Sequence, residues 1–163
     1  MKLHVKWPTR EAENLGEQID LERVCDHLSH AIRFKTISKV NEEEVDWTEF
    51  EKFHAYLKEA YPLVHQNLEL TEVGKAGLVY YWKGTDESLD PVAFLSHQDV
   101  VPVESGTEAD WEHDAFAGHN DGKIIWGRGA LDMKNHLISV IEAVECLLED
   151  GYQPTRGLYL LFG

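Results

Sequence analysis

Two short apolar runs, separated by a long amphipathic segment, constrain the fold of this chain more than any other feature. The runs cover residues 92–96 and 158–162, and their continuity is typical of strands that are buried on both faces. Between them, residues 133–149 carry apolar side chains at spacings of three and four, which predicts a helix. Gly151 is the expected C-terminal cap of this helix. Strand, helix and strand in this order predict an α/β fold with a partly parallel sheet.

The earlier part of the chain carries further helix and strand signals. Asp20 is a suitable N-cap for a helix over residues 21–32, and Pro62 is expected to end a second helix over residues 47–60. We expect a surface arm at residues 1–19 and a solvated acidic loop at 41–44. Two strands are expected at 68–73 and 77–82, a long loop at 104–121, and a short strand at 123–126.

The composition narrows the possible partners. The chain has 163 residues, of which 43% are hydrophobic, and this suits one compact domain with a real core. Its formal net charge of -15 repels phosphate backbones, so nucleic acid is a poor candidate partner. No apolar run approaches the length of a bilayer span, and the lysines near the start are not followed by the apolar stretch of a secretory signal. We therefore expect a soluble, cytoplasmic protein without a membrane partner.

Two side chains that can bind a metal follow directly on the first apolar run. His97 and Asp99 are two residues apart, so an extended backbone points both to the same side. Ligands of open α/β sheets gather at the carboxyl ends of strands, where this pair is expected. One ring nitrogen of His97 could bind a metal ion while Asp99 accepts a proton from the other. An isolated His-x-Asp is more often only a strand end before a turn, and here the buried strand that delivers the pair favours a metal site.

Asp132 is the second candidate metal ligand. It stands at the beginning of the predicted helix, after Gly127 and Gly129, which permit a sharp or left-handed bend. Asp is also a favoured helix N-cap, and that structural role is the alternative. The two roles are compatible, because a carboxylate has two oxygens and can use each for a different partner.

Other residues that could carry chemistry give weaker signals. His136 lies one helical turn after the candidate carboxylate and could join a single-metal or regulatory site. His113 and His119 are expected to be solvated or to face a substrate. Cys25 and Cys146 are expected to be small buried residues without a disulfide framework. The sequence lacks four common motifs. These are the Gly-x-Ser-x-Gly motif of serine hydrolases, the Walker loop, the Gly-x-Gly-x-x-Gly motif of dinucleotide-binding folds and the His-Glu-x-x-His motif of metallopeptidases.

Several motifs occur in an order and spacing that resemble one protein family. They are Phe-Leu-Ser-His-Gln-Asp-Val-Val-Pro-Val at 94–103, Trp111, Phe116, Asp-Gly at 121–122, and Trp-Gly-Arg-Gly-Ala-Leu-Asp-Met-Lys at 126–134. This pattern is similar to the zinc metallopeptidase family of aminoacylase, carboxypeptidase S (Gly-X carboxypeptidase) and succinyl-diaminopimelate desuccinylase. Among the branches of this family, the carboxypeptidase S branch is the most similar, because this chain carries Gly-Ala-Leu-Asp-Met-Lys-Asn at residues 129–135. The resemblance is strong over residues 92–163 and looser before them.

The resemblance implies a fold, a reaction and roles for the matched residues. The fold would be a mixed, partly parallel sheet flanked by helices, as in a phosphorylase/hydrolase-like catalytic domain. His97 would bind one metal, Asp132 would bridge two metals, and Asp99 would serve catalysis by orienting His97. The metals would be Zn2+, or Co2+ or Mn2+ in its place, and the substrate a small peptide or an N-acyl amino acid whose amide bond is cleaved by a metal-activated water.

The resemblance also implies that residues 1–163 are the N-terminal portion of a catalytic domain. In that family the general-base Glu, further metal ligands and a lid and dimerisation domain follow the strand that matches residues 158–163. The isolated chain is therefore predicted to be inactive, and a homodimer is expected only for the full-length protein. One departure is residues 111–116, where relatives often carry prolines before the Phe. The alternative is a non-catalytic binding module that keeps the fold without the catalytic Glu.

Overall fold

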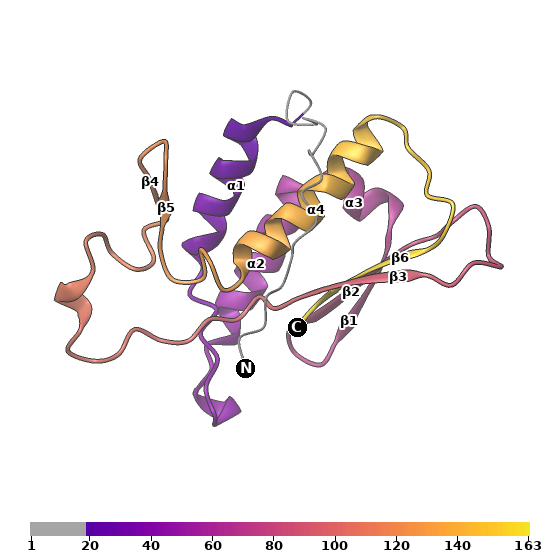
Figure 1. The fold of residues 1–163 in the computed structure, drawn as a ribbon. Helices are drawn as coiled ribbons and strands as arrows, with labels where there is room; N and C mark the ends of the chain where they lie inside the picture. The colour runs from indigo at the N-terminus through magenta and orange to yellow at the C-terminus, as the bar shows by residue number, and fades with distance from the viewer. Residues whose placement is uncertain (1–18) are drawn as a thin grey trace, which may run out of the picture.

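A mixed four-stranded sheet forms the centre of the fold in the computed structural model, which describes residues 19–163 (Figure 1). In spatial order its strands are β1 (Glu69–Val73), β2 (Gly77–Trp82), β6 (Leu158–Phe162) and β3 (Val92–Ser96). β6 pairs antiparallel with β2 and parallel with β3. The predicted α/β class with a partly parallel sheet is therefore confirmed, while the surface arm expected at residues 1–19 lies almost wholly outside the described residues.

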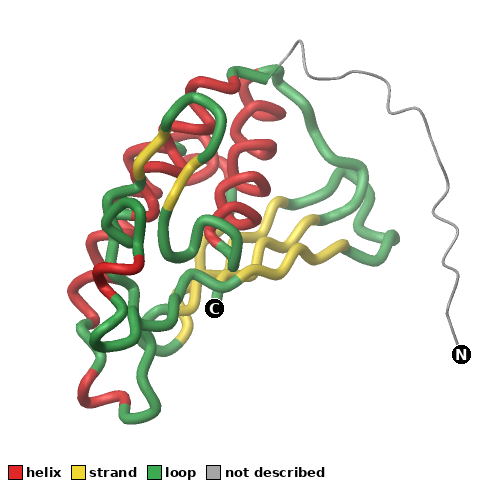
Figure 2. Tube along the Cα trace, turned by 60° about the vertical axis from the view of Figure 1, so that its left-hand side comes forward, coloured by secondary structure: helices red, strands yellow, loops and turns green. Residues whose placement is uncertain are grey.

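The α-helices gather on one face of this sheet (Figure 2). They are α1 (Leu21–Ile32), α2 (Trp47–Ala60), α3 (Pro62–Asn67) and α4 (Lys134–Glu149). Asp20 caps α1 as predicted, since its side chain accepts a hydrogen bond from the Arg23 N–H at 3.0 Å. No helix within residues 19–163 is both long enough and apolar enough to cross a bilayer.

The prediction for Pro62 was incomplete. α2 ends at Ala60 as expected, but Pro62 begins a further short helix, α3. Proline suits the first position of a helix, because the N–H that it lacks would have no partner there. The acidic segment expected to be a loop also contains a short 3-10 helix, η2 (Glu42–Glu44), and its residues are exposed.

The core lies between the helices and the face of the sheet that they cover. β2 shows the pattern most clearly, because Leu78, Tyr80 and Trp82 are buried and alternate with partly exposed residues. α2 and α4 contribute most of the helical side chains to this core, including Phe53, Leu57, Leu137, Ile138 and Ile141. The amphipathic pattern at residues 133–149 therefore has the predicted role, and Gly151 adopts the positive φ of 69° expected for a C-terminal cap.

β3 differs from its prediction. Its apolar run predicted burial on both faces, yet Phe94 is 40% exposed and Leu95 is 64% exposed. β3 is an edge strand with β6 as its only partner strand within residues 19–163, and the described residues leave these side chains on its two faces uncovered. The predicted strand is therefore confirmed. The predicted burial of both its faces is wrong for the described part of the chain.

The long loop expected at residues 104–121 contains a 3-10 helix and a strand. These are η3 (Glu108–Asp110) and β4 (His119–Asn120), and β4 pairs with β5 (Ile125–Trp126) in a small hairpin. The Asp121 carboxylate accepts from the Lys123 and Ile124 N–H groups, both at 2.8 Å, and so closes the turn. The hairpin stands beside α1, apart from the main sheet (Figure 1).

Candidate metal centre

The edge strand β3 delivers residues 97–99 to the carboxyl end of the sheet. The parallel pairing with β6 extends beyond β3, because the Gln98 N–H donates to Gly163 O at 2.8 Å. Val100 then forms a parallel bridge with Ile37, in the segment that follows α1. Residues 97–99 are therefore fixed on both sides by backbone pairing, which suits a segment that must hold side chains in a defined geometry.

A tightly packed bend brings Asp132 to the same place. Gly127 has a φ of 152° and Gly129 a φ of 88°, which side chains with a Cβ rarely allow. A Cβ on Gly127 would come within 2.5 Å of Ile32 Cγ2, and one on Gly129 within 2.8 Å of Val100 Cγ1. Glycine is thus required at both positions for the bend to approach α1 and the segment after β3.

The three predicted site residues lie together, with His97 between the two carboxylates. His97 Nε2 is 2.9 Å from Asp132 Oδ1, and His97 Nδ1 is 3.0 Å from Asp99 Oδ1. His97 Nδ1 is also 3.0 Å from the backbone oxygen of Asp99. Each ring nitrogen therefore faces an oxygen of a different aspartate, which fixes the orientation of the imidazole.

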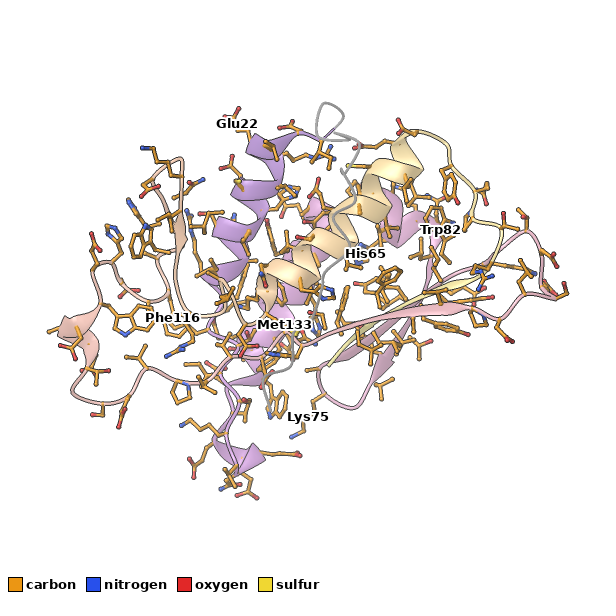
Figure 3. All side chains as sticks on the ribbon, viewed as in Figure 1. Glu22, His65, Lys75, Trp82, Phe116 and Met133 are labelled. Atoms are coloured by element: carbon orange, nitrogen blue, oxygen red, sulfur yellow. The ribbon has the colours of Figure 1, made fainter. Side chains whose placement is uncertain are left out.

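Asp132 is not the helix cap that its sequence position allowed. The N-cap of α4 is Met133, which makes no side-chain capping hydrogen bond. Met133 marks the beginning of α4 in Figure 3. The first turn is held instead by the Lys134 N–H, which donates to Gly129 O at 2.9 Å. The Asp132 side chain is 86% exposed, so its carboxylate is available to a ligand.

His97 carries the clearest electrostatic signature of the site. Partial burial by itself lowers the pKa of His97, but the hydrogen bonds to Asp132 and Asp99 and the charges of both outweigh it. The net effect raises the pKa of His97 above its ordinary value of 6.5. Two carboxylates thus favour a positive charge at the position between them.

The site lines a cleft of about 270 Å3. Besides the three candidate residues, Arg128 and Leu131 are among the residues that line it. Arg128 lies over the ring of Trp111, with its Cζ 5.2 Å from the ring centroid. This cation–π contact joins two motifs that are 17 residues apart and supports the wall of the cleft.

The donor set fits part of a zinc site and not a complete one. Imidazole nitrogen and carboxylate oxygen are both good Zn2+ ligands, and the second nitrogen of His97 has the acidic partner that zinc-binding histidines usually have. No group of three or more His, Cys, Asp or Glu side chains in the described part of the chain is arranged to hold a metal ion. His136 therefore does not join His97 and Asp132 in a three-ligand group among these residues, and its part in a metal site stays a prediction.

The remaining candidates have other surroundings. His113 and His119 lie against each other at the small hairpin, with ring centroids 3.9 Å apart. Cys25 and Cys146 lie on α1 and α4 as expected, but both are only partly buried. The His136 Nδ1 is buried and has no hydrogen-bond partner among residues 19–163.

Lys134 is a residue beside the site whose burial could not be predicted from its neighbours. It is fully buried, and its ammonium group donates to Ala31 O at 2.9 Å and to Phe34 O at 2.8 Å. Burial lowers its pKa to about 7. These acceptors are about a hundred residues away in the chain, so no local sequence pattern predicts the contacts. The motif that contains Lys134 was the one available signal.

Known proteins are similar to this chain in sequence over the segment that carries the site. The profile described as Peptidase family M20/M25/M40 matches residues 93–163, the segment that carries His97, Asp99 and Asp132. Carboxypeptidase S-like 2 of Dictyostelium discoideum is 43% identical over 146 residues, which cover 88% of this chain and 28% of that protein. Residues 93–163 belong to peptidase family M20/M25/M40.

One further relative is similar in sequence, and one solved structure is similar in fold. The mouse protein named N-fatty-acyl-amino acid synthase/hydrolase PM20D1 is 36% identical over 146 residues, covering 87% of this chain and 28% of that protein. Human carnosine dipeptidase 1 has the same fold over 86% of this chain and 31% of its own, with a TM-score of 0.69 at 17% sequence identity. The chain thus spans less than a third of the length of these proteins.

Proposed function

We propose that this M20 chain supplies the first half of the metal centre of a hydrolase that cleaves an amide bond of a small peptide or an N-acyl amino acid. Family membership supports the hydrolase class. The names of the similar proteins include a carboxypeptidase and an N-fatty-acyl-amino acid synthase/hydrolase, and both kinds of substrate contain an amide bond.

The observation that carries the proposal is the position of His97 between two carboxylates. Asp99 accepts the Nδ1 proton of His97, which leaves the lone pair of Nε2 for a metal ion. Asp132 Oδ1, at 2.9 Å from that nitrogen, would bind the same ion, and its second oxygen could bind another. A bound divalent metal would lower the pKa of a coordinated water and polarise the scissile carbonyl.

These three residues are only part of what a catalytic site needs. A catalytic zinc requires three protein ligands, and a general base must accept the proton of the attacking water. Residues 19–163 offer two ligands, so we expect the other ligands and the base to come from sequence that corresponds to the remaining length of the relatives. The second candidate function is a non-catalytic binding module, and the shortage of ligands is the observation that favours it.

Zinc titration of the 163-residue chain tests the partial site. We expect weak binding that His97→Ala or Asp132→Ala abolishes, measured by calorimetry above the pKa of His97. His136→Ala is the matched control, because no three-ligand group among the described residues includes His136, and its removal should leave binding unchanged. Equal zinc binding by wild type and His97→Ala would contradict the proposal.

An activity assay separates the two candidate functions. The isolated chain should not hydrolyse dipeptides or N-acyl amino acids in the presence of Zn2+ or Co2+. A longer form that adds the missing ligands should hydrolyse them, and His97→Ala should abolish that activity. A longer form that binds zinc through His97 but turns over neither substrate class would favour the binding module.

A further inference from the structure

Gln98, the residue between the two candidate site residues, is fully buried and its side chain is fully hydrogen-bonded. Its amide nitrogen donates to Phe162 O at 3.3 Å and also to Ala76 O. Its Oε1 lies 2.7 Å from Nε2 of His54, which is on α2. Because the amide nitrogen is occupied by two carbonyls, Oε1 is the acceptor and the His54 Nε2 proton is the donor.

The backbone of Gln98 is held as firmly as its side chain. The Thr36 hydroxyl donates to Gln98 O at 2.6 Å, and the Gln98 N–H donates to Gly163 O at 2.8 Å. Every polar group of this residue therefore has a partner, and the partners come from α2, the turn between β1 and β2, the end of β6 and the segment after α1. Such a network leaves the backbone of residue 98 little freedom.

The alternation of an extended chain links this network to the site. Successive side chains point to opposite sides, so Gln98 points into the protein while His97 and Asp99 face the cleft. A rotation of the peptide units at residue 98 would turn the side chains of both neighbours. The distances of His97 to Asp99 and to Asp132 therefore depend on how firmly Gln98 is held.

We propose that His54 and Gln98 are positioning residues of the metal centre, and that their hydrogen bond sets the orientation of His97 and Asp99. The positioning role concerns the same site as the proposed function. Its effect on metal binding rests on that proposed function. The proposed mechanism otherwise uses only side chains in the cleft. His54 does not line that cleft, so it acts through Gln98 alone.

The direct test reads the orientation of His97 without a metal. In the 15N-labelled 163-residue chain, the Nδ1–H proton of His97 should give an NMR signal that exchanges slowly, because it is bonded to Asp99. The signal is assigned to His97 by its absence in His97→Ala, and to Nδ1 rather than Nε2 by its persistence in Asp132→Asn. In His54→Leu and Gln98→Leu it should broaden or disappear while the circular dichroism spectrum shows a folded chain. A retained, unshifted signal in both variants would overturn the proposal.

Two further variants separate positioning from general stability. His54→Gln places an amide N–H near the position of the His54 Nε2 proton and should restore the signal. His65→Phe is the matched control, because His65 on α3 lines the same pocket as His54 and is hydrogen-bonded, at 3.0 Å to the Tyr80 hydroxyl, but makes no hydrogen bond to Gln98 (Figure 3). It should destabilise the chain without changing the His97 signal. Loss of the signal in His65→Phe to the same degree as in His54→Leu would contradict a specific role.

Zinc affinity distinguishes failure of this inference from failure of the proposed function. Loss of the His54 bond should weaken zinc binding about 10- to 100-fold, the usual effect of removing a partner that orients a ligand. If wild type and His54→Leu bind zinc equally, the inference fails and the proposed function stands. If the wild type binds no zinc while its NMR signal responds to His54→Leu, the proposed function fails and the positioning role stands.

Discussion

Acidic side chains inside α4 and just before its beginning have opposite surroundings. Within the helix, Glu142 is 3% exposed and Glu145 is 4% exposed, and both are fully hydrogen-bonded. Glu142 accepts from Arg23 Nε at 2.6 Å and pairs with His27 at 2.7 Å, while Glu145 accepts from the Leu63 and Val64 N–H groups at the beginning of α3. Just before the helix, the Asp132 side chain is 86% exposed, and its one partner among residues 19–163 is His97.

This difference separates structural carboxylates from one that can bind a ligand. Burying a carboxylate is costly unless hydrogen bonds compensate it, so Glu142 and Glu145 are committed to holding α1 and α3 against α4. Asp132 contributes little to packing and can exchange its present partner for an ion. The sequence does not show this distinction, because all three residues lie in or beside one amphipathic helix.

The largest expected effect comes from removing Glu142. Glu142→Ala would leave Arg23 and His27 without their buried partner, and we expect a loss of about 3–5 kcal/mol in the free energy of unfolding. Urea denaturation followed by circular dichroism measures it. Glu149→Ala is the control, since the Glu149 side chain is 43% exposed and its contact with Arg23 should contribute only about 0–1 kcal/mol. Equal losses in the two variants would remove the distinction between buried and exposed carboxylates.

An intermediate effect is expected at Lys134, between these two regions. Lys134→Met removes the hydrogen bonds to Ala31 O and Phe34 O, at a cost of about 1–3 kcal/mol near pH 9.5. Burial lowers the pKa of Lys134 to about 7, below the value of 10.5 expected in the unfolded chain. The unfolded state therefore binds more protons between these values, and the wild type gains stability as the pH rises through this window.

The measurement is the urea midpoint of both proteins near pH 7 and near pH 9.5. The advantage of the wild type over Lys134→Met should widen at the higher pH, because the wild type no longer buries a charge there. A difference that stays constant across the window would show that Lys134 does not titrate in it.

The smallest effect on stability is expected at Asp132. Asp132→Asn should change the free energy of unfolding by less than about 0.5 kcal/mol, because the side chain is exposed and caps no helix. It should lower the pKa of His97, since the hydrogen bond to Asp132 is the largest effect that raises it. An NMR titration of the His97 ring measures this shift, and Asp150→Asn at the C-terminal end of α4 is an exposed control. An unchanged pKa of His97 in Asp132→Asn would contradict the observed contact.

The same titration gives the sign of the pH dependence of the site. A raised pKa means that the charged form of His97 stabilises the folded chain fully below the unfolded value of 6.5, and that this contribution is lost as the pH rises through the higher folded value. Zinc bound as proposed would displace this proton, so zinc affinity should fall as the pH drops below the folded pKa of His97.

Local patterns were enough for most of the fold. The cap at Asp20 and the periodicity of residues 133–149 depend on neighbours within a few residues, and both predictions were confirmed. Burial of β3 depends on what covers a strand rather than on its own residues, so that prediction was wrong. Two predictions are not tested by the structure or by the similar proteins. They are that the chain is the N-terminal portion of a catalytic domain and that the protein is cytoplasmic.

The candidate site could be predicted only in part, for a related reason. His97, Asp99 and Asp132 belong to short motifs and could be proposed from sequence, whereas their roles stay predictions. The bond between His54 and Gln98 joins residues 44 positions apart, and the contact of Lys134 with Ala31 joins residues 103 apart. Neither pair lies within a local pattern, so only the folded arrangement reveals them.

The edge strand β3 has a consequence for how the 163-residue chain behaves at high concentration. Its outer edge presents backbone groups without a strand partner in the described residues, beside apolar side chains such as Leu95, and such an edge is a template for pairing between copies. At neutral pH the net charge of -15 keeps copies apart. Near the sequence pI of about 4.9 that repulsion vanishes, and light scattering should then detect association and precipitation. Colloidal stability of this chain is therefore expected to depend on its acidic surface.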